Sequence, residues 1–386
     1  MIHSRTSTLV RSPIAFLILL FAVGTFSPPT QAQTEDVAFV HGLFGNENSW
    51  AETRSVFHQE FDIRSYNQPY DSKSSIDQIA AGYGAEVPDG AVYIGHSMGG
   101  LVSRSAFDQN PDRVDALITL GTPHTGAPLA ANTDLIDDLA DDWIDGLSAG
   151  PSYQYGSIIG GTLAAVASEF LEGALSIIES VVSSTYASIQ DLRPESSFFQ
   201  DLENATPPAT YAVWSREDPN ALWRLADASL SDSGVETGDG IQIKEDAVAW
   251  YTMMYASAQS TADAYLQDYY DASWWNLVGK AYYWSKYSKW ASIAAGYYDG
   301  LEVLATRIDR DWETTIVGVG PNDTSGSGYV REVSDGVVPY SSQAPAFIGP
   351  EYQLSARGVN HLEQTQNAET RDRLRFALRQ IGVRGK

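Results

Sequence analysis

The stretch AVYIGHSMGGLVSRSAFDQ, residues 91–109, decides the fold class. Ala91–Ile94 is an apolar run typical of a buried strand, and residues 101–109 have the pattern of a helix. Between them, the motif G-x-S-x-G places Ser97 on a sharp turn, where glycines two residues before and after it remove Cβ atoms that would clash. Backbone N–H groups at the start of the helix point to where an oxyanion would form. The stretch therefore predicts a strand–turn–helix unit with Ser97 as a candidate nucleophile.

A second G-x-S-x-G copy, residues 146–150, competes with the first. It follows an aspartate-rich stretch, residues 134–145, and Pro151 comes directly after it. Because no strand leads into this copy, we interpret it as a flexible loop and do not expect Ser148 to be the nucleophile.

Short apolar runs alternate with helical patterns on both sides of the first motif. The runs that predict strands are residues 37–40, 61–66, 91–94, 116–120, 211–214, 314–319, 333–338 and 352–354. The patterns that predict helices in this part of the sequence are residues 75–83, 101–109 and 371–381. This alternation favours the α/β class, with a mostly parallel sheet flanked by helices.

The alternation stops near Pro128 and resumes after residue 312. We interpret residues 129–312 as a large, mainly helical lid or cap inserted into one domain that spans residues 33–386, with a sheet strand near 210–214 inside the insertion. A separate second domain is the alternative, because a segment of about 180 residues is long enough to fold alone.

Two segments of the insertion carry most of its apolar residues. A predicted helix at 163–181 has one apolar stripe, which includes Phe170 and Ile177 and needs a partner surface such as the core or an acyl chain. Residues 245–300 are helical in pattern and rich in Tyr and Trp, which more often build a helical core than a binding surface.

A nucleophilic serine needs a general base, usually histidine, that is oriented by a carboxylate. His361 precedes the last helix and fits a triad in the chain order serine, acid, histidine. The histidines that fit less well are His3 near the N-terminus, His41 and His58 before the serine, His96 beside it and His124 shortly after it. Asp335 lies in a turn before His361 and is the preferred acid, with Asp239 and Asp299 as alternatives.

The oxyanion of such a site needs two N–H donors. The residue after the nucleophile, Met98, is expected to supply one of them. The loop His41–Gly45 follows the first predicted strand, and Leu43 within it is the second candidate.

The first 32 residues have the pattern of a signal peptide. Arg5 and Arg11 precede an apolar run, Ile14–Val23, and small residues lie near Ala32. We therefore expect the mature protein to be secreted or periplasmic.

The chain of 386 residues contains no cysteine, and its 49 acidic side chains exceed its 24 basic ones, for a net charge of −25. The lack of cysteine excludes disulfides, and the charge argues against nucleic acid or an anionic membrane surface as partners. An acidic, salt-adapted surface is the simplest interpretation of the charge.

Five short blocks, taken together, resemble the bacterial triacylglycerol lipases and the related inositol-deacylase-like hydrolases. They are residues 40–43 (VHGL), 95–100 (GHSMGG), 121–126 (GTPHTG), 334–339 (SDGVVP) and 360–362 (NHL). The resemblance implies an α/β-hydrolase fold with a mobile helical lid, and carboxylic esters of lipids as substrates. It also implies a triad of Ser97, Asp335 and His361, with Leu43 and Met98 as oxyanion donors.

No cofactor is implied by the motifs, because the sequence has no dinucleotide fingerprint, P-loop or H-E-x-x-H. Some of the lipases that the chain resembles bind a structural calcium near the triad loops. Glu363 and Asp311 are the candidate ligands here, although no loop has the oxygen-rich spacing of a calcium site.

Three functions remain open at the level of sequence. The first is hydrolysis of lipid-like esters through an acyl-enzyme, in transient contact with a lipid interface. The second uses the same triad for acyl transfer or for deacylation of a phospholipid. The third is a non-catalytic protein whose aromatic residues bind a glycan or polymer. The sequence gives no indication of the oligomeric state.

Overall fold

The computed structural model describes residues 34–131, 185–202, 205–217, 220–232, 239–318 and 332–386, together with single residues between 136 and 175. Residues 35–386 form one compact unit. The predicted signal peptide, residues 1–32, and Ser148 lie outside the described residues.

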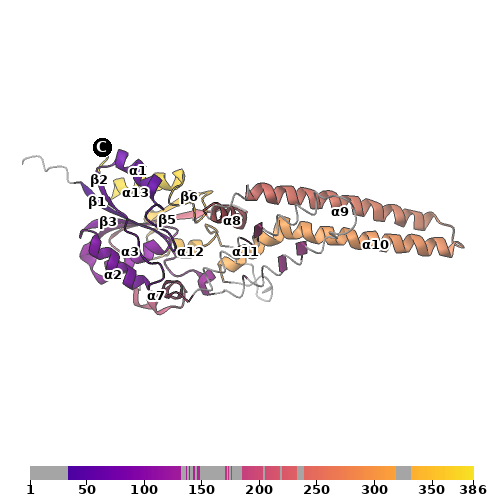
Figure 1. Cartoon of the computed structure of the whole chain (residues 1–386), viewed down its shortest axis with the longest axis horizontal. Helices are drawn as coiled ribbons and strands as arrows, with labels where there is room; N and C mark the ends of the chain where they lie inside the picture. The colour runs from indigo at the N-terminus through magenta and orange to yellow at the C-terminus, as the bar shows by residue number, and fades with distance from the viewer. Residues whose placement is uncertain are drawn as a thin grey trace, which may run out of the picture. The chain divides into compact units, whose positions relative to one another are not determined.

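The centre of the fold is a six-stranded parallel sheet with the strand order β2-β1-β3-β4-β5-β6 (Figure 1). Its strands are β1 (Glu35–Val40), β2 (Ile63–Tyr66), β3 (Ala91–His96), β4 (Val114–Leu120), β5 (Ala209–Arg216) and β6 (Gln353–Arg357). The α/β class predicted from the sequence is therefore confirmed. In an open parallel sheet, ligands bind at the carboxyl ends of the strands, and β3 ends directly before Ser97.

Helices cover both faces of the sheet because side chains alternate between the faces along each strand. In β1, Val37 and Phe39 pack into one apolar layer, whereas Ala38 and Val40 pack into the other. The first layer contains α1 (Ala51–Glu60) and α13 (Ala368–Gln380), and the second contains α2 (Ile76–Glu86) and α3 (Met98–Gln109).

The N-terminus of α2 shows how local sequence sets these boundaries. The side chain of Ser75 accepts a hydrogen bond from the backbone N–H of Gln78, and Asp77 lies in the first turn. Both features stabilise the start of a helix, because they satisfy a free N–H and complement the helix dipole.

Most of the described residues between β4 and β6 are helical, and β5 lies among them. The described helices there are α6 (Ala187–Asp191), α7 (Ser197–Leu202), α8 (Ala221–Asp232), α9 (Gly240–Asp271), α10 (Leu277–Glu302), a π-helical turn (Val303–Arg307), α11 (Ile308–Ile316) and α12 (Tyr340–Gln343), with 3₁₀ turns at Pro128–Ala131 and Pro350–Tyr352. The predicted strand at 211–214 falls inside β5, which pairs with β4 on one side and β6 on the other. The insertion is therefore joined to the sheet through one of its own segments.

Two predicted strands are wrong. Residues 314–319 overlap the end of α11, in which Ile308, Trp312 and Ile316 recur at four-residue spacing and are buried in one cluster. Helical packing outweighs the β-branched composition of this segment. Residues 333–338 form a loop, closed by the single bridge between Ser334 and Pro339 rather than by a ladder.

We expect the melting temperature to rise between low salt and about 1 M sodium chloride. Like charges already interact in the sheet, where burial and then the carboxylates of Asp115 and Asp36 raise the pKa of Glu35. Added salt shortens such repulsion from about 10 Å at 0.1 M to about 3 Å at 1 M. Potassium chloride should act equally, since screening depends on ionic strength. A flat or falling profile would contradict the salt-adapted interpretation of the net charge of −25.

Candidate active site

Ser97 lies on a strained turn between β3 and α3. Its backbone has φ 53° and ψ −128°, a conformation that non-glycine residues seldom adopt. The turn is fixed by the N–H of Ser97, which donates to the carbonyl of Leu120 at 2.8 Å. A Cβ atom on Gly95 would lie 2.6 Å from the backbone of Gly100, and one on Gly99 would lie 2.3 Å from the carbonyl oxygen of His41. Only glycine fits at these two positions of the motif.

The structure brings Ser97, His361 and Asp335 together. Nε2 of His361 lies 2.9 Å from Oγ of Ser97, and its Nδ1 lies 2.7 Å from Oδ2 of Asp335. Because Asp335 only accepts at this contact when ionised, Nδ1 carries the proton and Nε2 is left to accept from the serine hydroxyl. Asp335 and His361 are buried, whereas Ser97 is partly exposed.

The carboxylate of Asp335 is held by four donors. Its Oδ1 accepts from the backbone N–H groups of Val337 and Val338, at 3.1 and 2.8 Å. Its Oδ2 accepts from His361 and from Nε2 of Gln364, the latter at 2.8 Å. A buried carboxylate with this many donors is held in one orientation.

His96 holds the loop that carries His361. Its Nε2–H donates to the carbonyl oxygen of His361 at 2.9 Å. Burial lowers the pKa of His96 well below its usual value, so the ring is neutral at this contact. Sequence reasoning missed this positioning contact and that of Gln364, because nothing in the spacing separates either residue from an ordinary polar neighbour of the motif.

The remaining candidates lie elsewhere. Asp239 caps the N-terminus of α9, and Asp299 is exposed on α10. His58 lies 2.8 Å from Oγ of Ser65, and His124 lies 2.9 Å from Oγ1 of Thr119, where burial lowers its pKa well below the usual value. None of these contacts reaches Ser97.

The loop after β1 runs directly beside Ser97. A Cβ atom on Gly42 would lie 2.9 Å from Cβ of Ser97, so the backbone of residues 42–43 is close to the nucleophile. The ring of Tyr70 stacks on His41 with 3.9 Å between ring centroids, and its hydroxyl donates to the carbonyl of His41. Tyr70 thus holds the loop that contains Leu43, while Met98 begins α3, where backbone N–H groups have no partner within the helix.

The two candidate calcium ligands have other partners. Glu363 pairs with Arg224 at 2.8 Å. Asp311 accepts from Nε1 of Trp143 at 3.3 Å and from Nε of Arg310 at 3.0 Å. Each carboxylate therefore has a cationic partner, and their two sets of contacts share no residue.

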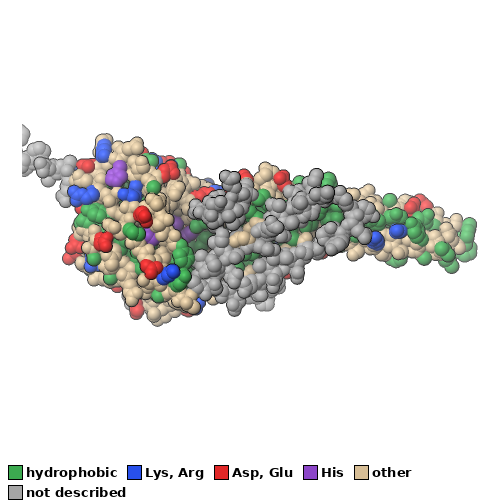
Figure 2. All heavy atoms as spheres, in the orientation of Figure 1, with side chains coloured by type: hydrophobic (Ala, Val, Ile, Leu, Met, Phe, Trp, Pro, Cys, Tyr) green, Lys and Arg blue, Asp and Glu red, His purple; other side chains and the backbone are tan. Residues whose placement is uncertain are grey.

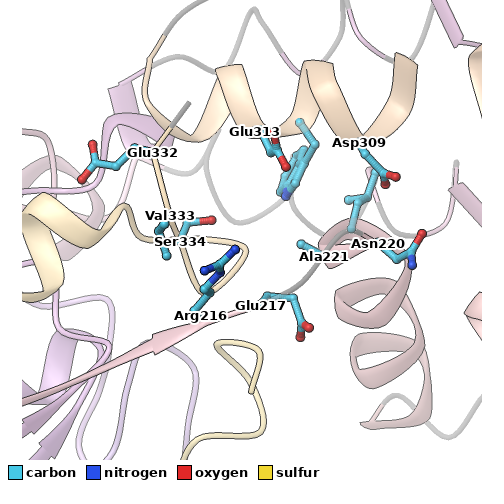
Figure 3. A pocket seen from close by; sticks show the side chains of 11 residues that line it. Arg216, Glu217, Asn220, Ala221, Asp309, Glu313, Glu332, Val333 and Ser334 are labelled. Carbon is cyan, nitrogen blue, oxygen red and sulfur yellow. The ribbon is translucent and has the colours of Figure 1, made fainter. Parts of the chain in front are cut away.

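A cavity of about 210 Å³ lies between β5, α11 and the loop that carries Asp335 (Figure 3). Trp312 in its wall donates Nε1–H to the carbonyl of Gly336 at 2.9 Å, which supports that loop. Neither Ser97 nor His361 lines the cavity. The labelled side chains that line it are Arg216, Glu217, Asn220, Ala221, Asp309, Glu313, Glu332, Val333 and Ser334.

Comparison with known proteins finds a match to the PGAP1-like alpha/beta domain over residues 70–223. This range contains Ser97 and Met98, whereas Leu43, Asp335 and His361 lie outside it. The GPI inositol-deacylase of Emericella nidulans is 30% identical over 144 residues, which cover 33% of this chain and 11% of that protein. The GPI inositol-deacylase of Xenopus laevis is 32% identical over 120 residues, 27% of this chain and 13% of that protein.

Among solved structures, a lipase of Bacillus licheniformis in its mature form has 16% sequence identity and a TM-score of 0.34, and the match covers 54% of this chain and 76% of that one. The chain spans only about a tenth of the length of the curated relatives that it matches. The chain thus has the fold of an α/β-hydrolase, and its sequence is similar to the PGAP1-like alpha/beta domain and to the GPI inositol-deacylases.

Proposed function

We propose that this protein hydrolyses carboxylic esters of lipids through an acyl-enzyme formed on Ser97. The observation that carries the proposal is the continuous hydrogen-bonded line from Oγ of Ser97 through His361 to Asp335. The strained turn under Ser97 adds support, since such strain persists where a site requires it.

The proposed reaction begins when Oγ of Ser97 attacks the ester carbonyl and its proton passes to Nε2 of His361. The tetrahedral oxyanion accepts hydrogen bonds from the N–H groups of Met98 and Leu43. His361 then gives the proton to the departing alcohol, and the acyl group stays on Ser97. A water molecule then gives a proton to Nε2 and attacks the acyl carbonyl, and as the bond from Oγ to the acyl carbon breaks, His361 returns the proton to Oγ of Ser97 and the acid leaves. Asp335 keeps the imidazole oriented throughout and stabilises its cationic form.

A second candidate is deacylation of an inositol-bearing lipid with the same three residues. The matches to GPI inositol-deacylases favour it, and it differs from the first candidate only in the alcohol that departs. Acyl transfer to an alcohol in place of water is a further variant of the same chemistry.

Chromogenic esters of increasing acyl length, compared with an acylated phosphatidylinositol, test these candidates. Hydrolysis of the chromogenic esters that peaks at long chains supports a lipid ester hydrolase. Release of fatty acid from the inositol ring alone supports the deacylase. If the protein cleaves neither the chromogenic esters nor the acylated phosphatidylinositol, both candidate functions are contradicted.

We also propose that the insertion, residues 129–312, forms the cap over the acyl chain. The side chain of Tyr186 in this insertion packs against the buried cluster that contains Met98. Its ring contacts the edge of Phe44, with 6.1 Å between centroids, and Phe44 adjoins the candidate oxyanion donor Leu43. An aromatic pair of exposed Phe44 and partly buried Tyr186 therefore lies beside the proposed oxyanion site, where an acyl chain would leave the ester.

Phe170, also in the insertion, belongs to the core rather than to the surface beside the proposed oxyanion site. It is buried and stacks on Trp223 with 5.7 Å between ring centroids. Its substitution by serine would lower stability and all activities together, so we assign Phe170 to packing. Ile177 lies outside the described residues.

Replacing Phe44 by serine should lower kcat/KM for a long-chain ester by about tenfold and leave acetate and butyrate esters almost unchanged. A partly exposed aromatic ring contributes contact area only to a chain that is long enough to reach it. The matched control is Phe376→Ser, because Phe376 on α13 is exposed to the same extent, 48% against 47%. Equal losses on short and long esters, or equal effects of the two substitutions, would contradict the acyl-binding role.

A further inference from the structure

Helices α9 and α10 pack along each other as an antiparallel hairpin, joined by residues 272–276 (Figure 1). The inner part of the hairpin belongs to the protein core, where Tyr251, Ala258 and Ala294 are buried in one cluster. Residues 263–293, which we call the outer hairpin, contain no buried residue. The chain therefore continues the two helices well past the point where they add to the core.

The connection at the end of the outer hairpin is well defined. The side chain of Asn276 caps α10 by accepting from the N–H of Gly279 at 2.9 Å. Lys280 donates to the carbonyl of Tyr269 on α9 at 2.7 Å and lies over the ring of that tyrosine. These contacts join the two helices and hold the connecting residues in one arrangement.

Large apolar side chains gather at this end and face solvent (Figure 2). Trp274 and Trp275 in the connection are 78% and 69% exposed, and Leu277 and Val278 in the first turn of α10 are 72% and 84% exposed. Further exposed aromatic side chains nearby are Tyr270, Tyr282 and Trp284. A contiguous group of this kind on a soluble protein marks a surface that binds something.

The charges near this group differ from those of the whole protein. Three of the six lysines in the chain, Lys280, Lys286 and Lys289, lie on α10, and residues 272–298 contain no Asp or Glu. The acids of the outer hairpin, Asp263, Asp268 and Asp271, all lie on α9. The outer hairpin is therefore neutral overall and positive along α10, in a chain whose net charge is −25.

The acids of the described core have little effect on this end. At a rise of 1.5 Å per residue, Asn276 lies roughly 27 Å along α10 from Ala294, where the helix joins the core. That distance is about three times the Debye length of roughly 8 Å at physiological ionic strength. The repulsion expected between the whole chain and a lipid surface is thus screened at the end of the hairpin.

We propose that the outer hairpin docks on the surface of a phospholipid membrane. Trp274, Trp275, Leu277 and Val278 enter the interfacial region, while Lys286 and Lys289 contact lipid phosphates. Indole and phenol rings favour that region because one part of each ring is apolar and another is polar, and lysine reaches the head groups from beside them. Leu277 and Val278 favour a lipid over a glycan, since aliphatic side chains contribute little to stacking on sugar rings. Among the described residues, no helix is long and apolar enough to cross a membrane, and surface docking requires none.

Sedimentation of the full-length protein with vesicles tests this proposal separately from the proposed hydrolysis. The vesicles are phosphatidylcholine alone and phosphatidylcholine mixed with phosphatidylglycerol. The double substitution Trp274→Ala and Trp275→Ala should lower the partition coefficient at least about tenfold on both. Lys286→Gln with Lys289→Gln should remove the preference for vesicles that contain phosphatidylglycerol. Phe376→Ala, an exposed aromatic on α13, is the matched control and should change neither.

All variants should keep the melting temperature and the rate on a soluble acetate ester, because none of these side chains is buried and none belongs to the site at Ser97. If neither the native protein nor any variant cleaves that ester, the proposed hydrolysis is refuted. The vesicle result then still decides the docking proposal. The docking proposal is overturned if the native protein does not sediment with vesicles, or if the tryptophan variant sediments equally well. It is also overturned if light scattering shows a dimer that the tryptophan variant dissociates, because a second copy then covers the surface.

Discussion

Replacement of Ser97 by alanine should lower the turnover of an ester substrate by a factor on the order of 10⁴ to 10⁶. Oγ of Ser97 is the atom that His361 contacts at 2.9 Å, and no other group in the described site can take its place as nucleophile. The melting temperature should stay within a few degrees, because the turn is held by the backbone bond to Leu120, which alanine retains. Steady-state kinetics and thermal unfolding measure the two effects.

The control for this substitution is Ser148→Ala, in the second copy of the motif. That variant should keep full activity. The assignment of the nucleophile is wrong if Ser97→Ala stays active and Ser148→Ala does not. A third outcome, loss of activity together with unfolding of Ser97→Ala, is separated by the thermal measurement and by Ser97→Gly, which should fold and stay inactive.

Replacement of Asp335 by asparagine should lower turnover by about 10⁴-fold. At Oδ2 the carboxylate accepts from two donors, His361 and Gln364. An amide nitrogen at that position is itself a donor and cannot accept from His361. The proton of the imidazole would therefore shift to Nε2, which could then no longer accept the proton of Ser97. The effect should appear in kcat, because the substrate does not touch this residue.

Asp239→Asn and Asp299→Asn are the controls for Asp335. Asp239 caps α9 and Asp299 is exposed on α10, so neither change should alter kcat by more than about twofold. A large loss at either control with a small loss at Asp335 would show that the acid has been assigned to the wrong loop.

Much of the sheet was predictable, because its strands are short apolar runs that end in recognisable turns. The run 91–94 and the glycines after it predicted β3 and the turn at Ser97. A predicted strand is wrong where composition favours a strand and packing favours a helix. Residues 314–319 are rich in β-branched side chains, yet Trp312 and Ile316 pack on the helical cluster formed by the insertion, which the sequence alone does not reveal.

The same limit applies to the site. Ser97 and His361 were identified from a motif and from chain order, and the structure places their side chains in contact. Gln364 and His96 could not be identified in this way, because their roles depend on tertiary distances to Asp335 and to the carbonyl of His361. A residue that positions another residue leaves no mark in the local spacing of the sequence.

The hairpin of α9 and α10 has a consequence for how this protein can change in evolution. Because residues 263–293 include no buried side chain, equal deletions or additions in both helices would leave the core contacts of Tyr251 and Ala294 intact. Each added turn in both helices would extend the hairpin by about 5.4 Å. Insertions and deletions in related genes should therefore be paired across residues 272–276, so that the hairpin varies in length among species while the sheet keeps its size.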